Sequence, residues 1–307
     1  MIKLYENIEA ERERIEVAIK RFGRTSDHNL DWWLCIGITP EAAPVFAEWP
    51  DGRGLLTHRY ENAWRIWSDP LSPEKEMAAR VEEFAAFIFE HHPHIELVWC
   101  DDVSDKIYPE LEKNGTLKLD KVYYSLLWPV MDMASYDPHL SGGHFKEMRN
   151  ARNKFYREHE VNILQASDVA KDDLYNIVDA WKNGVTKKQK EDVRDLKYHL
   201  VIQNDFRGFL TSRVIVADGR PVGFNAGYEV PNRSGRFTSA IGIHDYSLKD
   251  LGTILWLEDL EWIKNAGYRE FDMQGSEYDW EIKYKTQFGA AVIERKTDTF
   301  SIRPSSP

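Results

Sequence analysis

The stretch that most constrains the fold is Phe237–Gly289, because its pattern changes between strand and helix twice. Residues 237–244 form a strand-like run, and apolar residues then recur at helical spacing over 254–263. Gly267 follows, where a left-handed helix end favours a residue without a side chain. Residues 268–273 predict a second strand, after which a short helix completes a βαβα unit. Such units bind ligands at the carboxyl ends of their strands, beside the helix N-termini.

Length and composition indicate a folded protein of two ordinary domains. The chain has 307 residues, of which 42% are hydrophobic, and its 11 Trp can help to fill large cores. The formal net charge of −11 provides no general attraction to nucleic acid or anionic lipid, so such binding needs a local basic patch. We therefore expect no DNA partner and no membrane partner.

Cysteine usage and the N-terminal sequence favour a cytoplasmic location. Cys35 and Cys100 lie in apolar runs, which is typical of buried thiols in a reducing compartment rather than of a disulfide. The first 22 residues lack the apolar core of a signal peptide, and no stretch approaches a membrane span in length.

The two halves of the chain show similar orders of elements. Each has a hairpin, then a helix, a strand, a short helix and a final strand, which is a mixed α/β order. Between them lies Pro129–Gly143, with two prolines, two adjacent glycines and no clear period. We expect two domains of similar topology, 1–135 and 136–307, with the candidate site in the second.

Local patterns predict the individual elements. In the first half these are a helix over 4–21, an apolar strand over Asp31–Ile38, a hairpin of Gly54–Tyr60 and Ala63–Ser68, a helix from Ser72 to His91, a strand over Ile95–Cys100, a helix over Ser104–Asn114 and a strand over Lys121–Trp128. In the second half they are a helix over 145–157, a strand over Val161–Gln165, a helix over Ala170–Asn183, a basic loop with Lys187, Lys188 and Lys190, a helix over Leu196–Phe206, a hairpin of Phe209–Ala217 and Val222–Glu229, and a closing strand over Ala291–Ile302.

The helix expected over 145–157 carries the clearest basic face of this acidic protein. Its apolar arc contains Arg152, which needs a carboxylate partner if it is buried and which can be structural or face a ligand. The polar arc is either a solvated surface or a cradle for phosphates or the acceptor end of tRNA. The residues of this arc are Lys146, Arg149, Asn150, Asn153, Lys154 and Arg157.

Other catalytic and metal-binding motifs are missing from the sequence. His91, His92 and His94 surround Pro93 at a helix end, so their side chains diverge and we expect no metal site. We find no Ser-His-Asp or Cys-His spacing, no P-loop and no dinucleotide fingerprint.

Three polar residues near the end of the βαβα unit are candidates for chemistry. Asp272 and Glu277 can act as a base or anchor an amine, although acidic residues are also common in ordinary loops. Lys285 lies beside Tyr284 on the last helix, where an ammonium can neutralise a developing oxyanion or hold a phosphate. Alternatively, Lys285 is a surface charge whose stem covers a neighbouring aromatic ring.

Two segments resemble a known family. Leu140-Ser141-Gly142-Gly143, followed by Met148–Phe155, resembles the opening of the second domain in the phosphatidylglycerol lysyltransferase C-terminal-domain family. Lys285-Thr286-Gln287-Phe288-Gly289 is similar to the ending shared by that family and the Fem-type peptidyltransferases, in which two residues separate the lysine from phenylalanine-glycine. The resemblance covers residues 30–295. It implies two GNAT-like acyltransferase domains in tandem, the C-terminal one usually carrying the site.

Two departures from the family pattern bear on the substrates. Family members that modify lipid carry a large membrane domain, which these 307 residues do not contain, so we do not expect a lipid acceptor. In ordinary GNAT enzymes the acetyl-CoA loop has a basic residue followed by two spaced glycines, whereas Lys249–Thr253 keeps only Gly252. This difference favours aminoacyl-tRNA over acyl-CoA as the donor.

The resemblance therefore predicts an aminoacyltransferase, acting from aminoacyl-tRNA on an amine or hydroxyl of a small molecule or peptide, without a further cofactor. Since the donor ester is already activated, the protein mainly aligns the acceptor and stabilises the oxyanion. We assign Lys285 to the oxyanion or a phosphate, and Asp272 or Glu277 to the acceptor amine. Donor and substrate binding are assigned to Arg149, Asn150, Arg152, Asn153, Lys154, Gly252, Gln274 and Tyr284. An acyl-CoA-dependent N-acyltransferase and a catalytically silent GNAT-fold binding protein remain alternatives.

Overall fold

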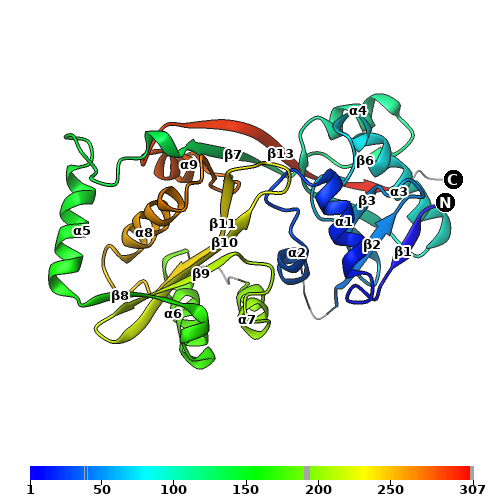
Figure 1. The fold of residues 1–307 in the computed structure, drawn as a ribbon. Helices are drawn as coiled ribbons and strands as arrows, with labels where there is room; N and C mark the ends of the chain where they lie inside the picture. The colour runs from blue at the N-terminus through cyan, green and yellow to red at the C-terminus, as the bar shows by residue number, and fades with distance from the viewer. Residues whose placement is uncertain (38, 40, 190–193, 305–307) are drawn as a thin grey trace.

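The computed structural model describes residues 1–37, 39, 41–189 and 194–304, which form an α/β protein around one long mixed sheet (Figure 1). The strands are β1 (Lys3–Tyr5), β2 (Ala43–Glu48), β3 (Gly54–Arg59), β4 (Ala63–Ile66), β5 (Leu97–Ser104), β6 (Lys118–Leu119), β7 (Tyr124–Asp132), β8 (Val161–Gln165), β9 (Thr211–Ala217), β10 (Arg220–Glu229), β11 (Arg236–His244), β12 (Glu270–Asp272) and β13 (Ala291–Arg303). The α-helices are α1 (Arg12–Phe22), α2 (Leu30–Ile36), α3 (Met77–His91), α4 (Ile107–Asn114), α5 (Lys146–Glu158), α6 (Lys171–Gln189), α7 (Leu196–Gln203), α8 (Leu251–Asn265) and α9 (Asp279–Thr286).

The strand order shows a similar arrangement in the two halves. The sheet runs β1-β2-β3-β4-β5-β13-β7-β12-β11-β10-β9-β8, with β6 beside β13. In the first half antiparallel strands lead to β4, which pairs in parallel with β5 after α3 crosses over. In the second half antiparallel strands lead to β11, which pairs in parallel with β12 after α8 crosses over. This correspondence agrees with the expected order of elements.

The last strand belongs to both halves. β13 pairs antiparallel with β7 along Ala291–Thr299 and antiparallel with β5 along Thr297–Ile302. Figure 1 shows β7 and β13 running together from one half of the molecule into the other. The sheet is thus continuous across the expected boundary, and Pro129–Asp132 lie within β7. The division into 1–135 and 136–307 remains a prediction.

Alternate residues of a strand point to opposite faces of the sheet and join different hydrophobic cores. On β2, Val45 and Ala47 join the core under α3, whereas Phe46 joins the core formed with α1 and α2. On β9, Val214 packs with α6 and α7, whereas Ile215 packs with α5 and α8. Period-two alternation with both faces apolar is the pattern of a sheet covered by helices on both sides.

The expected strand over 31–38 is wrong, because α2 occupies Leu30–Ile36. Asn29 caps this helix by accepting a hydrogen bond from the Trp32 amide at 2.9 Å. Trp33 packs in the core with α1, while Trp32 packs in the core with α7. A helix buried on several sides is apolar around its circumference, so a short apolar run does not distinguish it from a buried strand. Residue 38 lies outside the described residues.

Several other boundaries shift. The expected helix over 4–21 begins only at Arg12, because residues 3–5 pair with β2 as β1. The expected basic loop is in part the end of α6, which runs to Gln189, and Lys190 lies outside the described residues. The patterns did not predict β2 or β6, whereas the other expected helices and strands lie within a few residues of their predicted positions. Cys35 and Cys100 are buried and form no disulfide, as expected. Within the described ranges, no helix is sufficiently long and apolar to cross a membrane.

Candidate functional site

The candidate site lies where two parallel strands separate. β11 pairs with β12 at Arg236–Thr238 opposite Glu270–Asp272, and then continues along β10 to His244. The chain beyond β12 turns away at Gln274, whose φ of +62° is uncommon for a residue with a side chain. The Gln274 side-chain amide donates to the Thr238 hydroxyl at 2.6 Å and bridges the two strands where they part.

A cavity of about 980 Å³ fills the space beyond this bridge, and we name it the strand-split cavity. Its walls are formed by β11, α7, the first turns of α8, the turn after β12 and α9. Four residues assigned from the sequence line it, namely Gly252, Gln274, Tyr284 and Lys285. The βαβα pattern therefore located a shared cavity, because the ends of parallel strands meet at one edge of a sheet.

Gly252 lies against the ring of His244 at the edge of this cavity. A Cβ at this position would lie 2.9 Å from the His244 ring. His244 also packs on Tyr246, with 4.5 Å between the ring centroids. Gly252 thus allows the N-terminal turn of α8 to approach the end of β11 closely.

Lys285 is bound by the turn that separates the two strands. Its ammonium donates to the Gln274 carbonyl at 3.1 Å, the Gly275 carbonyl at 3.3 Å and the Ser276 hydroxyl at 2.6 Å. Burial lowers the pKa of Lys285 to about 8, although Glu281 and Asp272 favour its charged form. An ammonium has three N–H donors, so a substrate oxygen has to replace one of these contacts.

A second lysine in the cavity was not singled out from the sequence. Lys197 on α7 lies 5.0 Å from the centre of the Tyr198 ring and 5.8 Å from that of Trp32. Burial lowers the pKa of Lys197, and within the described residues no carboxylate lies within ion-pair distance. Its position in the apolar run of α7 was the available signal, because a single lysine among apolar residues of a helix is costly to bury.

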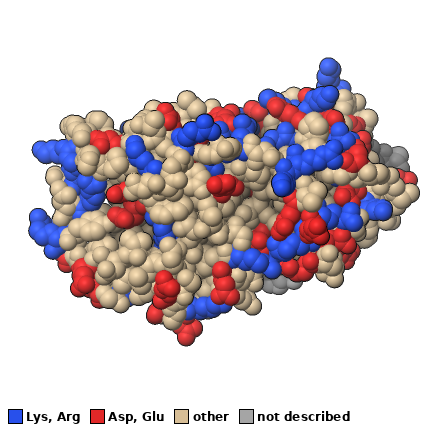
Figure 2. All heavy atoms as spheres, in the orientation of Figure 1, with Lys and Arg blue, Asp and Glu red and all other residues tan. Residues whose placement is uncertain are grey.

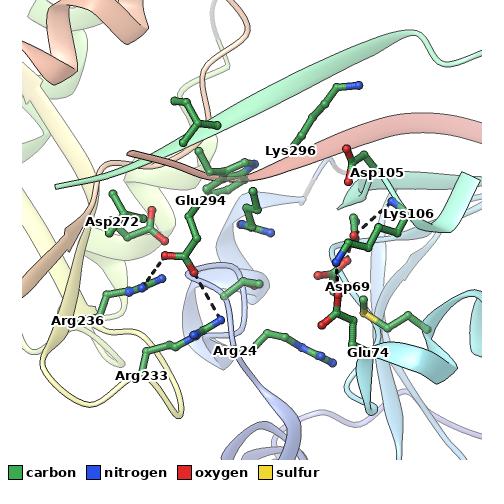
Figure 3. Close-up of a pocket in the computed structure, with 17 residues that line it drawn as sticks. Arg24, Asp69, Glu74, Asp105, Lys106, Arg233, Arg236, Asp272, Glu294 and Lys296 are labelled. Carbon is green, nitrogen blue, oxygen red and sulfur yellow. Dashed lines mark hydrogen bonds and ion pairs between the residues drawn. The ribbon is translucent and has the colours of Figure 1, made fainter. Parts of the chain in front are cut away.

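Asp272 lies on a different cavity, between the two halves. This space of about 480 Å³, which we name the junction cavity, is lined by residues of both halves, and Asp272 is only 3% exposed (Figure 3). The Asp272 carboxylate accepts the Gln274 amide at 3.0 Å, and burial raises its pKa. Glu277 is exposed and lines neither cavity. The three residues assigned to chemistry are therefore not brought into one cavity.

The basic helix α5 lies at one end of the molecule, where Figure 2 shows clustered Lys and Arg side chains. Arg149 donates to the carbonyls of Leu140 and Gly142, the latter at 2.6 Å, and Arg152 donates to the Pro138 carbonyl at 2.7 Å. These arginines hold the loop before α5. The hydrogen-bond partner of the Arg152 guanidinium is a carbonyl rather than the carboxylate expected from the sequence. Lys154 lies 3.8 Å from Glu158 at the surface. None of the residues that line either cavity belongs to α5.

One group of possible metal ligands occurs in the described part of the chain. Asp179, Asp195 and His199 hold their ligand atoms within 4.8 Å of one another on α6 and α7. Lys182 already binds Asp195 at 3.2 Å, so this carboxylate has a cationic partner. His92 and His94 contact only edge to face, with 6.2 Å between their ring centroids.

Comparisons with known proteins agree with this architecture. The sequence profile described as "Phosphatidylglycerol lysyltransferase, C-terminal" matches residues 45–277, whereas a search of curated proteins gives no significant match. The fold is similar to L-PGS from Bacillus licheniformis, with a TM-score of 0.65, 14% identity and coverage of 96% of this chain and 92% of that one. It is also similar to FemX, with a TM-score of 0.63, 8% identity and coverage of 94% and 95%.

A third similar structure is a tandem GNAT protein from the clavulanic acid biosynthesis pathway, with a TM-score of 0.59, 10% identity and full coverage of both chains. At these identities the structures establish the fold, which is the tandem GNAT-like fold expected from the sequence. The profile match covers most of the chain. The protein therefore belongs to the phosphatidylglycerol lysyltransferase C-terminal family and is an enzyme of the acyl- and aminoacyl-transferring class.

Proposed function

We propose that the protein transfers an aminoacyl group from aminoacyl-tRNA to an amine or hydroxyl of a small molecule or peptide. The observation that carries this proposal is the strand-split cavity. It opens between two parallel strands, is about 980 Å³ in volume and contains the partly buried ammonium of Lys285. A cavity of this size can take an aminoacyl group together with the sugar to which it is esterified.

The chemistry asks little of the protein beyond alignment and charge stabilisation. For an amine acceptor, the nitrogen lone pair attacks the ester carbonyl carbon and the carbonyl oxygen becomes an oxyanion. The bond from carbon to the ribose oxygen then breaks, and a proton from the amine passes to the departing oxygen. Lys285 donates to the oxyanion after exchanging one of its three contacts in the turn after β12, and a fixed donor of this kind lowers the barrier.

The N-terminus of α8 favours an ester donor over acyl-CoA. A helix N-terminus attracts phosphates through its free amides. Here Asp250 precedes the helix with a φ of +66°, and the same residue lines the strand-split cavity. A carboxylate at this point stabilises the helix dipole and opposes a pyrophosphate group. The loop over Lys249–Thr253 also keeps only one glycine. Both features argue against acyl-CoA as the donor.

The exposed basic residues of α5 supply a surface for the tRNA phosphates. Phe155 packs in the same apolar core as Leu251, the first residue of α8, so α5 lies behind the helix that borders the cavity. Lys154 and Arg157 are exposed on this helix, next to exposed Asn150 and Asn153. In a protein with a net charge of −11, such a local patch is what tRNA binding requires.

The experiment that tests the donor measures the binding of aminoacyl-tRNA to a double variant, Lys154→Glu with Arg157→Glu. We expect a loss of at least about tenfold in affinity and a shallower dependence on salt, because fewer counterions are released. Arg149 is a poor choice for this test, since it holds the loop before α5. Lys113→Glu with Lys121→Glu is the matched control, because both residues are exposed in the first half and give the same change in net charge. Equal tRNA affinity in the two double variants, or tight binding of acetyl-CoA by the wild type, would favour the acyl-CoA alternative.

A further inference from the structure

The junction cavity contains buried carboxyl groups that form no ion pair within the described residues. Figure 3 shows Asp272 on one wall, with Asp69, Glu74 and Lys106 on the other. Asp69 follows β4 of the first half and Asp272 ends β12 of the second, and they are 6% and 3% exposed. Asp27, between α1 and α2, is 4% exposed and interacts electrostatically with Asp272 and with Asp102 of β5.

The charge of the Arg295 guanidinium acts on all four of these carboxyl groups. Arg295 of β13 binds Asp27 at 2.9 Å and stacks on the Trp128 ring at 3.6 Å. Within the described residues, Asp69, Asp102 and Asp272 form no ion pair, and Asp102 Oδ1 has no hydrogen-bond partner. Burial raises the pKa of all four acids, to about 7 for Asp27, and the positive charge of Arg295 offsets only part of the rise.

The hydrogen bonds to Asp69 and Asp272 occupy only one oxygen of each carboxyl group. Asp69 accepts the Ser104 amide at 2.6 Å, and Asp272 accepts the Gln274 amide at 3.0 Å. Neutral amides reduce the cost of burying a carboxylate but do not cancel its charge. A cation that enters the cavity therefore gains more from these groups than it gains at the protein surface.

Arg24 supplies the complementary charge on another part of the wall. Its guanidinium donates to the backbone carbonyls of Pro70 and Ser72 and forms no ion pair within the described residues. Its buried Nε atom has no hydrogen-bond partner there. The other cations around the cavity are already paired, since Arg233 and Arg236 bind Glu294 and Lys106 binds Glu74.

We propose that the junction cavity is a second small-molecule site, which takes a primary amine that also carries an anionic group. The ammonium binds at Asp272 and the anionic group binds at Arg24. A primary ammonium fits because its three N–H donors can serve several carboxylate oxygens, and a cavity of about 480 Å³ holds a compound of amino-acid size. This inference goes beyond the proposed function, because it concerns a cavity other than the strand-split cavity and does not depend on tRNA.

The test is calorimetric titration of the folded wild-type protein with two compounds of this class. L-lysine represents amino acids, in which the anionic group is a carboxylate, and O-phosphoethanolamine represents aminoalkyl phosphates. We expect at least one of them to bind, and its N-acetylated form to bind at least tenfold more weakly. Cadaverine, which has amines but no anionic group, should also bind more weakly. No heat from either compound would overturn the proposal.

Four variants show whether binding occurs at the junction cavity. Asp272→Asn should weaken binding at least tenfold, whereas Asp172→Asn, on the exposed first turn of α6, should leave it unchanged. Arg24→Met should weaken the binding of the anionic ligand but not that of cadaverine, so the affinities for these two ligands should converge. Lys283→Met should bind normally, because Lys283 is exposed and lines neither cavity.

The variants also separate failure of this proposal from failure of the proposed function. Unchanged binding in Asp272→Asn and in Arg24→Met would overturn the junction site even if aminoacyl-tRNA binds as expected. If Asp272→Asn does not fold, the convergence expected for Arg24→Met decides the matter. Loss of tRNA binding with normal amine binding would leave the junction site standing and remove the donor assignment.

Discussion

The βαβ units of the two halves differ in what lies between their parallel strands. In the first half, β4 pairs with β5 from Ala63 to Ile66, and the neighbouring Trp64 and Cys100 are fully buried. In the second half, β12 ends after three residues and the chain turns away from β11. The first unit packs as core, whereas the second opens into the strand-split cavity. The same arrangement of strands thus provides either packing or a site, depending on where the second strand ends.

The largest expected effect is on stability and concerns the first βαβ unit, which packs as core. Phe84 on α3 is fully buried, with its ring 5.6 Å from that of Trp64. Phe84→Ala should lower the free energy of unfolding by about 3–5 kcal/mol, because it removes buried surface and leaves a cavity. Urea denaturation measures this change. Trp280→Ala, which removes an aromatic ring that is 63% exposed at the strand-split cavity, should cost less than about 1 kcal/mol. Equal losses would contradict the distinction between the two units.

The next effect concerns catalysis in the open unit. Lys285→Met should lower the transfer rate about 100- to 1000-fold, which is typical for the loss of one donor to an oxyanion. We also expect a modest fall in melting temperature, since Lys285 binds three acceptors in the turn after β12. Lys283→Met is the control, because Lys283 is exposed on the same helix. A Lys285→Met enzyme with normal turnover would remove this residue from the chemistry.

The buried ammonium should also appear in the dependence of stability on pH. The pKa of Lys285 is lowered from 10.5 to about 8 on folding, so between these values the unfolded chain binds more protons than the folded protein. Stability contributed by this group should therefore rise with pH across that window, by at most about 3 kcal/mol. Urea midpoints measured from pH 7.5 to pH 10 for the wild type and Lys285→Met test this. A wild-type curve that does not rise relative to the variant would show that the ammonium is solvated.

The smallest expected effect concerns the approach of α8 to β11. Gly252→Ala should destabilise the protein by about 1 kcal/mol, because the new methyl group meets the His244 ring at 2.9 Å. Alanine in an exposed helix would instead stabilise by a similar amount. Thermal unfolding distinguishes these signs, and a stabilised variant would show that His244 moves freely into the cavity.

The sequence predicted the cavity residues of the second βαβ unit better than it predicted the cavity residues that come from other elements. Gly252 lies in the first turn of α8 and Gln274 follows β12, whereas Tyr284 and Lys285 lie on α9. All four belong to one βαβα unit, so their proximity follows from the order of elements. Lys197 comes from another helix, and its proximity depends on tertiary packing that periodicity does not report. Asp272 was correctly identified as a strand-end residue, but the face to which it points depends on the register of a three-residue strand.

Residues that act between the halves could not be predicted in the same way. Asp27, Asp69 and Arg295 are separated by long stretches of sequence and meet only because β13 passes between β5 and β7. The basic arc of α5 was visible in the sequence, but the contacts of Arg149 and Arg152 depend on the loop over residues 138–142. Charge patterns identify a face, and the local chain path decides how much of that face is available to a ligand.

The position of β13 affects how the protein is made. β5 ends at Ser104, but the strand that covers its edge begins at Ala291. At ordinary rates of translation of about 5–20 residues per second, the first half is complete in sequence roughly 10–40 s before this strand leaves the ribosome. During that interval β5 presents unpaired backbone groups, the kind of edge at which chains associate. A nascent chain of this protein therefore has a late and vulnerable step, and a partner that covers β5 during synthesis would raise the yield of folded molecules.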